Sequence, residues 1–559
     1  MKRIFLLPVF ILTLGTSLFA QWTSNPMQNT IVQDSSGTEQ ATPLIASLPD
    51  GKTYISWFDM YNGQFQLKMQ LLDSEGYKLW AGAGLVVSNQ PQNSALFRYD
   101  LKTDKEGNAI VAFQDERTGA MEVVAYKVSP TGAMLWGANG ILLTDSLSPG
   151  GGLSPTIGIT NNNDVIIAWN ASAGSTKWIS FQKITANGSF GWNAVHRVTD
   201  PVKKYGRAVF APTGSSDFIM MYVEEVGNFP GVTCTMYAQR YDTGGNPIWA
   251  LPSKVSTKTI TFFFFPRIRP DGAGGFDFAF TTSHPQSASL NDVYAQHMDQ
   301  NGVVWSPTGT ETGDSLCQKL SNGFDKDAST GNLWVSMQVL DGAQSQSGIY
   351  IQCLDALGNK LLGNNGKKVL PVSATYYLPY SITSTNDGLI IIYKQGGYSA
   401  ELMYAIKVDY NGLPMWTNPV NICGVNSNKD KVQTGDFSPY QLVVVWDDDR
   451  IDGGIYAQNI TSGGALGITT GIESETISNN AKLFPNPSSQ PVLVVNVREN
   501  NLATISINDV YGKLLFEQCE QLNAGKNIIQ PSIPELSDGL YIVNIKTNSG
   551  TSTLKWVKK

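Results

Sequence analysis

The chain is poor in charge and in histidine, and each shortage excludes a class of protein. Only 15% of its 559 residues are charged, the formal net charge is −7, and no long lysine or arginine run occurs. Nucleic-acid binding needs a basic surface, so that class is excluded. The three histidines, His196, His284 and His297, stand far apart and form no spaced metal or triad motif. We therefore predict no metal site from them.

Cysteines and long apolar runs are scarce as well. The five cysteines include no CxxC pair, so neither a zinc site nor a redox motif is indicated, and one disulfide stays open as an alternative. Residues 1–20 combine a basic start, an apolar stretch and a small residue at Ala20, which predicts a secretory signal peptide. No later run approaches about 18 apolar residues, so no transmembrane segment is predicted in the mature chain.

What the sequence does contain is glycine and a repeat that ends in tryptophan. A Gly followed four residues later by Trp occurs in EGYKLW, TGAMLW, NGSFGW, GGNPIW and NGLPMW, and NGVVW is one residue shorter. In LGNKLL, Leu362 stands where tryptophan would be. The interval is about 56 residues, which indicates a repeat architecture. The repeated residues are Trp22, Trp80, Trp136, Trp192, Trp249, Trp305 and Trp416.

Each repeat is predicted to contain four strands. The second is a β-branched and aromatic run such as AIVAFQD (109–115), the third ends at the glycine turn, and the fourth begins with tryptophan. Four-stranded units at this period are typical of a β-propeller. The eighth copy, ending near Thr461, lacks a fourth strand. We therefore predict an all-β fold, an eight-bladed β-propeller over 21–465 that is closed by the N-terminal strand.

The tryptophan-ended turn is predicted to be structural, because it recurs throughout the repeat, whereas an active-site element should occur once. Burying such a ring stabilises by roughly 2–3 kcal/mol. The spacing, best seen in TGAMLW, resembles the tryptophan-docking motif of eight-bladed quinoprotein dehydrogenases and their non-enzymatic propeller relatives. The quinone enzymes also carry two adjacent cysteines beside the cofactor. No two cysteines are neighbours here, so a quinone cofactor is not predicted.

A second domain is predicted after a linker at 466–480. The alternating segments VLVVNV, TISIND and YIVNIK predict a small β-sandwich over 481–559. The region also contains Phe484, Pro485, Asn486, Pro487, Tyr511, Gly512, Gly539, Tyr541, Lys555, Lys558 and Lys559. With these residues it resembles the type A C-terminal sorting domain of the type IX secretion system of the Bacteroidetes lineage. The resemblance implies type IX secretion machinery as partner, and a protein secreted or attached to the outer-membrane surface.

The loops between second and third strands vary most and are predicted to form a ligand face, since variable loops on a rigid scaffold carry specificity. No cofactor or metal is predicted. The segment DDDRIDGG offers oxygen ligands that suit calcium, although it lacks the EF-hand spacing, so calcium is an alternative. The candidate ligand-face residues are Asp59, Asp115, Glu116, Arg117, Glu224, Glu225, Asp447, Asp448, Asp449, Arg450 and Asp452.

These features predict a secreted or cell-surface propeller that binds a glycan or protein without catalysis. Two alternatives stay open, a polysaccharide hydrolase with paired carboxylates on the ligand face and a purely structural surface protein. An enzyme should gather two or three carboxylates beside a cleft, whereas a binding module should expose aromatic side chains. The aromatic run 262–265 is predicted to pack in the core, with an exposed patch as the alternative.

Overall fold

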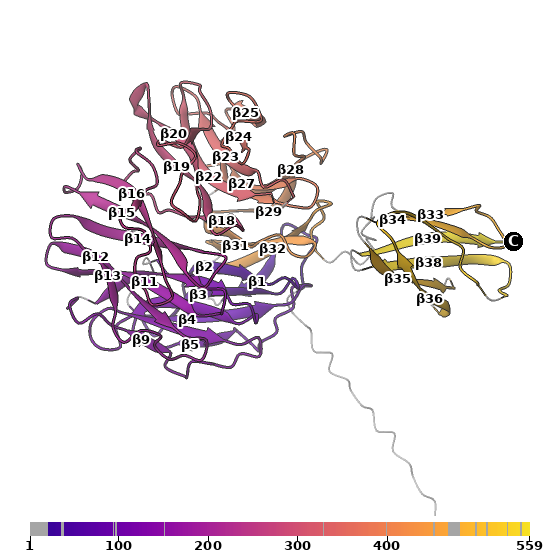
Figure 1. Ribbon diagram of the computed structural model, residues 1–559, viewed down its shortest axis with the longest axis horizontal. Coiled ribbons are helices and arrows are strands. Elements are labelled where there is room, and N and C mark those ends of the chain that lie inside the picture. Colours follow the sequence, from indigo (N-terminus) through magenta and orange to yellow (C-terminus); the bar gives the residue numbers. More distant parts are fainter. Residues whose placement is uncertain are drawn as a thin grey trace, which may run out of the picture. The chain divides into compact units, whose positions relative to one another are not determined.

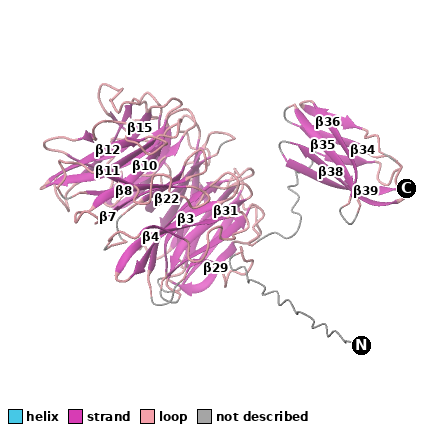
Figure 2. Ribbon diagram, turned by 90° about the horizontal axis from the view of Figure 1, so that it is seen from below, coloured by secondary structure: helices cyan, strands magenta, loops and turns pink. Residues whose placement is uncertain are grey.

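The computed structural model (Figure 1) describes residues 21–467 and 481–559, apart from short breaks at 35–37, 93, 96–97, 150, 328, 398–399, 451–452, 498–499, 510–512, 534 and 548–549. The predicted signal peptide and most of the predicted linker lie outside these residues. All regular elements of the described residues are β-strands (Figure 2). Within the same residues, no helix has the length and apolar character needed to cross a membrane.

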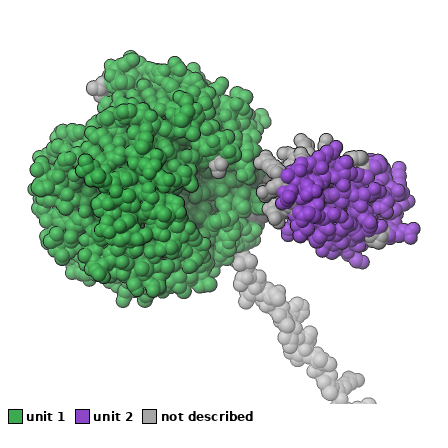
Figure 3. All heavy atoms as spheres, viewed as in Figure 1, with its two compact units in different colours: residues 1–468 green, residues 469–559 purple. Residues whose placement is uncertain are grey.

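The chain divides into two compact units, residues 1–468 and 469–559, shown in green and purple in Figure 3. Over its described residues, the first unit contains eight antiparallel four-stranded sheets. Seven sheets have their strands in chain order. The first four of these are β2 (Gln40–Ser47), β3 (Thr53–Tyr61), β4 (Gln64–Leu72) and β5 (Leu85–Ser88); β6 (Asp100–Thr103), β7 (Ala109–Asp115), β8 (Glu122–Val128) and β9 (Ile141–Leu143); β10 (Gly152–Ile159), β11 (Val165–Ala173), β12 (Thr176–Ile184) and β13 (His196–Val198); and β14 (Lys204–Pro212), β15 (Phe218–Val226), β16 (Thr233–Tyr241) and β17 (Ser253–Lys254).

In the other three sheets in chain order, the second and third strands are again long, with seven to twelve residues each. These sheets are β18 (Arg269–Pro270), β19 (Phe276–His284), β20 (Ser287–Met298) and β21 (Thr310–Glu311); β22 (Gln318–Lys326), β23 (Leu333–Leu340), β24 (Ser347–Leu354) and β25 (Lys367–Ser373); and β26 (Tyr377–Ser384), β27 (Leu389–Gln395), β28 (Glu401–Val408) and β29 (Val420–Ser427).

The eighth sheet combines the two ends of the unit. Its order is β1-β32-β31-β30, and its members are β1 (Thr30–Gln33), β30 (Lys429–Thr434), β31 (Gln441–Asp448) and β32 (Gly454–Thr461). β1 pairs antiparallel with β32, with Thr30 opposite Ala457 and Gln33 opposite Ile455. In Figure 1, β1 lies beside β32. The N-terminal strand therefore supplies the outer strand of a sheet whose other strands come from the end of the unit.

Each sheet contacts the next sheet along the chain, and the last contacts the first. The contacts run from β2 to β6, β10, β14 and β18, then from β20 to β22, β26 and β30, and β30 returns to β2. Sheets covered on both faces should have apolar second strands, because neither face meets water. The strand β7 fits this expectation, since all seven of its residues are buried. β-Branched and aromatic side chains fill the space between sheets.

The repeated tryptophan joins neighbouring sheets. In six copies the indole Nε1 donates to a carbonyl in the glycine turn of the next sheet, for example from Trp80 to Pro130 O at 2.9 Å. The glycine of that turn lies against the ring. A Cβ on Gly188 would be 2.7 Å from Cδ1 of Trp136, and Gly188 has φ +89°, which L side chains rarely adopt. Both the contact and the backbone conformation therefore require glycine there.

The second unit consists of two antiparallel sheets that share one hydrophobic core. One sheet has the order β33-β34-β37, and the other β36-β35-β38-β39. Leu493 comes from the first sheet, and Ile505, Val543 and Trp556 from the second; all four are buried in the same cluster. The strands are β33 (Ala481–Phe484), β34 (Val492–Val497), β35 (Asn501–Asn508), β36 (Leu514–Leu522), β37 (Gly525–Ile529), β38 (Gly539–Thr547) and β39 (Gly550–Lys558).

Candidate functional site

Most of the predicted ligand-face carboxylates are held by cations of the same sheet. Asp115 and Asp448 are the last residues of second strands, Asp59 lies two residues before the end of one, and all three are buried. Burial would raise the pKa of Asp448, but hydrogen bonds from Arg450 and Ser427 hold that pKa below its usual value. The ion pairs, measured from nitrogen to carboxylate oxygen, are Asp59–Lys68 (2.8 Å), Asp115–Arg117 (2.7 Å) and Asp448–Arg450 (2.6 Å).

Glu224 and Glu225 are also engaged. Glu224 Oε2 is 2.8 Å from Lys203 Nζ, and Glu225 Oε1 is 2.5 Å from Arg207 Nη2. These contacts leave little free charge for a ligand. Glu116 is half-buried and its backbone N–H donates to Pro91 O. Asp452 lies outside the described residues.

A cavity of about 470 Å³ brings together the remaining candidates, Asp447 and Asp449. Two carboxylates that the sequence pattern does not single out, Glu39 and Asp430, line it as well. Asp430 is the cross-strand partner of Asp447, so the two side chains lie on the same face of the sheet. Burial raises the pKa of Asp447 to about 6, and the charges of Asp430 and Asp449 add to the rise. The cavity therefore contains one carboxyl group with a pKa near neutrality, and other carboxyl groups line the same space.

Asp447 also has a structural partner in the next sheet, because its Oδ2 accepts the backbone N–H of Thr42 at 3.3 Å. Thr42 has φ +54° at a bulge of β2. The same bond recurs elsewhere, from Ser154 N to Gln114 Oε1 (3.2 Å) and from Arg207 N to Asn170 Oδ1 (3.1 Å). In each case a side chain near the end of a second strand holds a positive-φ residue of the following sheet. Asp447 is the one carboxylate in this set of three.

The run Phe262–Phe265 divides between the core and the surface. Phe262 and Phe264 pack against the cluster formed by β15, β16 and β19, whereas Phe263 is 72% exposed and Phe265 is 39% exposed. Phe229, from the β15–β16 loop, is 64% exposed and contacts Phe262 and Phe263 with ring centroids 5.7 and 6.0 Å apart. The predicted core packing is therefore wrong for the two exposed residues. We call Phe229, Phe262, Phe263 and Phe265 the phenylalanine patch.

Arginines surround this patch. Arg98 Cζ lies 4.1 Å from the centre of the Phe265 ring. Arg207 Nη1 donates to the carbonyls of Phe262 and Phe264 at 2.8 and 2.9 Å, so the Glu225–Arg207 ion pair fixes the segment that carries the patch. Burial and the charge of Arg267 lower the pKa of Arg98 to about 10. Among the described residues, neither Arg98 nor Arg267 forms an ion pair with a carboxylate.

A further cluster was missed because no motif marks it. His284 at the end of β19, Asp292 in β20 and Glu311 in β21 each offer a ligand atom, and these atoms lie within 4.8 Å of one another. Burial and the neighbouring Asp292 raise the pKa of Glu311 to about 7. The three residues have no regular spacing in the sequence. Only the β19–β20 hairpin and the short outer strand β21 bring them together.

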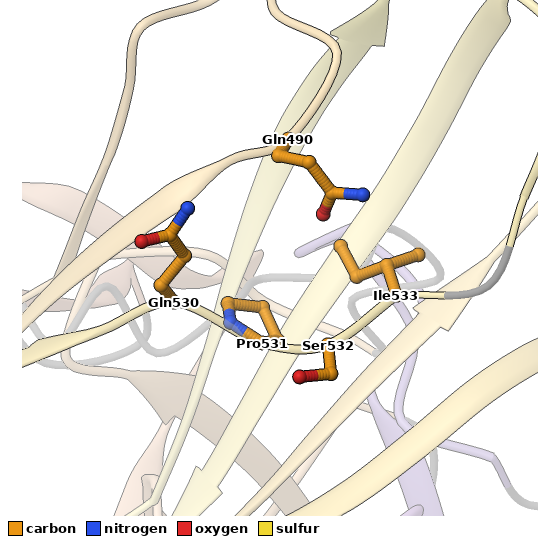
Figure 4. A pocket seen from close by; sticks show the side chains of 5 residues that line it. All are labelled: Gln490, Gln530, Pro531, Ser532 and Ile533. Carbon is orange, nitrogen blue, oxygen red and sulfur yellow. The ribbon is translucent and has the colours of Figure 1, made fainter.

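The second unit has a cavity of its own, also of about 470 Å³, lined by Gln490, Gln530, Pro531, Ser532 and Ile533 (Figure 4). These side chains are amide, hydroxyl or aliphatic, so the cavity offers no acid–base chemistry. Among the sorting-motif residues, Asn486 has a structural role. The Asn486 side chain donates to Lys555 O at 2.7 Å and accepts the N–H of Val557 at 2.8 Å, which ties the start of the unit to its last strand. Tyr511 and Gly512 lie outside the described residues.

Comparison with protein families assigns the second unit. Residues 482–559 match the family model described as the secretion system C-terminal sorting domain. This match confirms the predicted type IX sorting domain, and it indicates that the protein is exported from the cell by the type IX system. The match does not extend into the first unit. The search among curated proteins finds no match.

Solved structures resemble the chain only distantly. A polysaccharide lyase described as PL25 ulvan lyase is 13% identical, with 80% of this chain and 94% of that chain covered, at a TM-score of 0.41. An α-L-arabinanase of Penicillium chrysogenum is 12% identical, with 62% and 98% covered, at 0.33. Prolyl oligopeptidase B of Galerina marginata is 11% identical, with 82% and 55% covered, at 0.39. Similarities this weak assign no function to this chain.

Proposed function

We propose that the first unit is an eight-bladed β-propeller, closed by β1, that works outside the cell as a non-catalytic binding module. The eight sheets and the β1–β32 pairing support the architecture. The observation that carries the binding function is the phenylalanine patch with its arginines. Type IX export places this surface outside the cell or on the cell surface, where glycans and other proteins are available as ligands.

The patch has the properties of a contact surface for a sugar. Phe229 and Phe263 keep most of their ring area in water, which is unfavourable by roughly 25 cal/mol per Å² of apolar surface unless a ligand covers it. Arg207 and Glu225 hold the patch segment in place, so binding would order few side chains. Arg98 and Arg267 carry positive charge without a carboxylate partner among the described residues, which favours an acidic glycan over a neutral one.

A glycan-binding assay with the full chain tests this proposal. We expect wild-type protein to bind acidic polysaccharides, and the double variant Phe229→Ala, Phe263→Ala to bind at least about 10-fold more weakly, because lost stacking contacts of about 1.4 kcal/mol correspond to that factor. Arg98→Gln should weaken the binding of acidic ligands more than the binding of neutral ones. Leu251→Ala is the matched control, since Leu251 is 79% exposed and lies outside the patch. Absence of binding, or equal binding by the double variant, would refute the proposal.

The acidic cavity supports a second candidate function, hydrolysis of a polysaccharide. Asp447, with its pKa near 6, is suited to donate a proton, and its cross-strand partner Asp430 supplies the second carboxyl group that glycoside cleavage requires. The same protein preparation, assayed for release of reducing ends, separates the two functions. Turnover that is lost in Asp447→Asn would favour the hydrolase, whereas binding without turnover favours the module.

A further inference from the structure

The cluster of His284, Asp292 and Glu311 is built from side chains that are buried without full hydrogen bonding. His284 is 4% exposed and Asp292 is fully buried. The Nε2 of His284 and the Oδ2 of Asp292 have no hydrogen-bond partner, and these two atoms lie 3.7 Å apart. Buried polar atoms in folded proteins nearly always have a partner, so two orphan atoms that face each other require an explanation.

The other polar side-chain atoms of Asp292 and His284 have hydrogen-bond partners, which sets the two orphan atoms apart. The Oδ1 of Asp292 accepts the backbone N–H of Val293 at 2.8 Å and the Nζ of Lys319 at 3.1 Å. The Nδ1 of His284 accepts the N–H of Gln286 at 3.0 Å. Two side chains are therefore held in place by one atom each, while their second polar atom points into the space shared with Glu311.

We propose that His284, Asp292 and Glu311 form a binding site for a divalent transition-metal ion of the zinc class. One imidazole nitrogen and two carboxylate oxygens are a donor set that suits zinc, whereas calcium and magnesium prefer oxygen alone. Zinc holds such ligands at about 2.0–2.2 Å, so ligand atoms must lie on the order of 3–4 Å from one another. The observed spread of up to 4.8 Å requires only a small inward movement of side chains. Three protein ligands also leave one position for water or a ligand.

Lys319 and the His284 tautomer set the cost of binding. With Nδ1 accepting the Gln286 N–H, the neutral ring holds its proton on Nε2. Metal binding needs that nitrogen free, so the proton must move to Nδ1 and the ring gives up one ordinary hydrogen bond. Lys319 also repels the ion, but its Nζ is paired with only one of the two carboxylates, that of Asp292.

Metal titration of the full chain tests the site. After treatment with a chelator and dialysis, the protein is titrated with zinc by calorimetry, and bound metal is counted by elemental analysis. We expect one equivalent of zinc per chain, an affinity at least tenfold lower in Glu311→Gln and in His284→Gln, and weaker binding of calcium than of zinc. The control His196→Gln changes a histidine of β13 outside the cluster and should retain the wild-type affinity.

Several results would overturn the proposal. These are absence of zinc binding by folded wild-type protein, equal affinity in Glu311→Gln, and tighter binding of calcium than of zinc. His284 is buried, so its variant could fail to fold; Glu311 is only half-buried, and Glu311→Gln keeps the test decisive. Far-UV circular dichroism of each variant establishes that it is folded before titration. A zinc-induced rise in the melting temperature that is absent in Glu311→Gln would support the site independently.

Discussion

At the scale of single residues, the acidic side chains of the first unit act mainly as acceptors that hold the backbone and neighbouring cations. Asp145 shows this most fully. Its carboxylate is buried and accepts hydrogen bonds from Arg197 Nε at 2.8 Å, Ser180 Oγ at 2.6 Å and Trp178 Nε1 at 3.0 Å. Burial alone would raise the pKa of Asp145, but these bonds outweigh it and hold that pKa far below its usual value. A carboxylate in such a setting stabilises the fold.

We expect Asp145→Asn to destabilise the first unit by about 3 kcal/mol at pH 7, because it leaves Arg197 without its partner. The folded pKa is depressed, so the contribution is present above the unfolded value near 3.9 and is lost as the pH falls toward the folded pKa. The difference between variant and wild type should therefore shrink below about pH 4. Urea unfolding at pH 7 and at pH 3 measures both effects.

Asp50→Asn is the matched control for this prediction, since Asp50 pairs with Lys52 on the surface. Exposed pairs contribute about 0–1 kcal/mol, so this variant should unfold almost as the wild type does. Equal stability of Asp145→Asn and wild type at pH 7 would contradict the role given to Asp145.

At the scale of elements, the tryptophan of one sheet and the glycine turn of the next form a joint that recurs along the chain. Trp136 is 8% exposed, and its ring packs against Gly188 while Nε1 donates to Ala186 O at 3.4 Å. The outer strands are short, as in β9 and β13 with three residues each. Such strands have few ladder hydrogen bonds, so the indole joint supplies contacts that the strands lack.

We expect Trp136→Ala to destabilise the first unit by about 3–5 kcal/mol, the range for removing a large buried aromatic side chain. Leu135→Ala is the control, because Leu135 is the adjacent residue and is 48% exposed; it should change stability by less than about 0.5 kcal/mol. Thermal unfolding of the two variants is followed by far-UV circular dichroism, which reports mainly the backbone structure. Similar melting temperatures for both variants would show that the joint contributes little.

At the scale of the whole molecule, the first unit depends on a strand that is distant in sequence from its sheet. β1 covers the edge of β32, and without it that edge would present unpaired backbone groups to solvent. Asn29 reinforces the contact, since its side chain donates to Ile422 O at 2.8 Å. The second unit has its own core and its own end-to-end tie through Asn486. Each unit therefore has its own set of stabilising contacts.

Deletion of residues 22–33 should expose the β32 edge and remove the Trp22 joint. We expect the deleted protein to self-associate and to melt at a lower temperature, because an exposed edge pairs with other chains. Size-exclusion chromatography with light scattering measures the association. Ile31→Lys is the control, as Ile31 belongs to β1 but is 45% exposed. A deleted protein that stays monomeric and as stable as the control would show that β1 is dispensable.

The sequence predicts much of the fold because the repeat is a local and regular signal. Second strands appear as β-branched and aromatic runs, and glycine and tryptophan recur at one interval, so the strand pattern can be inferred without knowledge of any contact. The eighth copy lacks a fourth strand, and Trp22 stands about one repeat before Trp80, so the sequence points to the N-terminal segment. The sorting domain can be identified from the sequence equally well, because its segments occur in a fixed order that the family model recognises.

The candidate sites could not be inferred in the same way. The sequence gives no reason to separate Asp115, which Arg117 holds, from Asp447, which meets Asp430 only when β30 and β31 pair. Phe263 contacts Phe229, which belongs to another loop, and only the folded chain brings the two rings together.

A repeated sequence by itself determined the strand pattern, the joints between sheets and the export domain of this protein, because periodic and contiguous signals survive in a linear chain. Tertiary structure alone decided which charges are neutralised, which aromatic rings meet water and which three side chains could share a metal ion. Those properties depend on distances between residues that are far apart in the sequence, and burial and charge act through space.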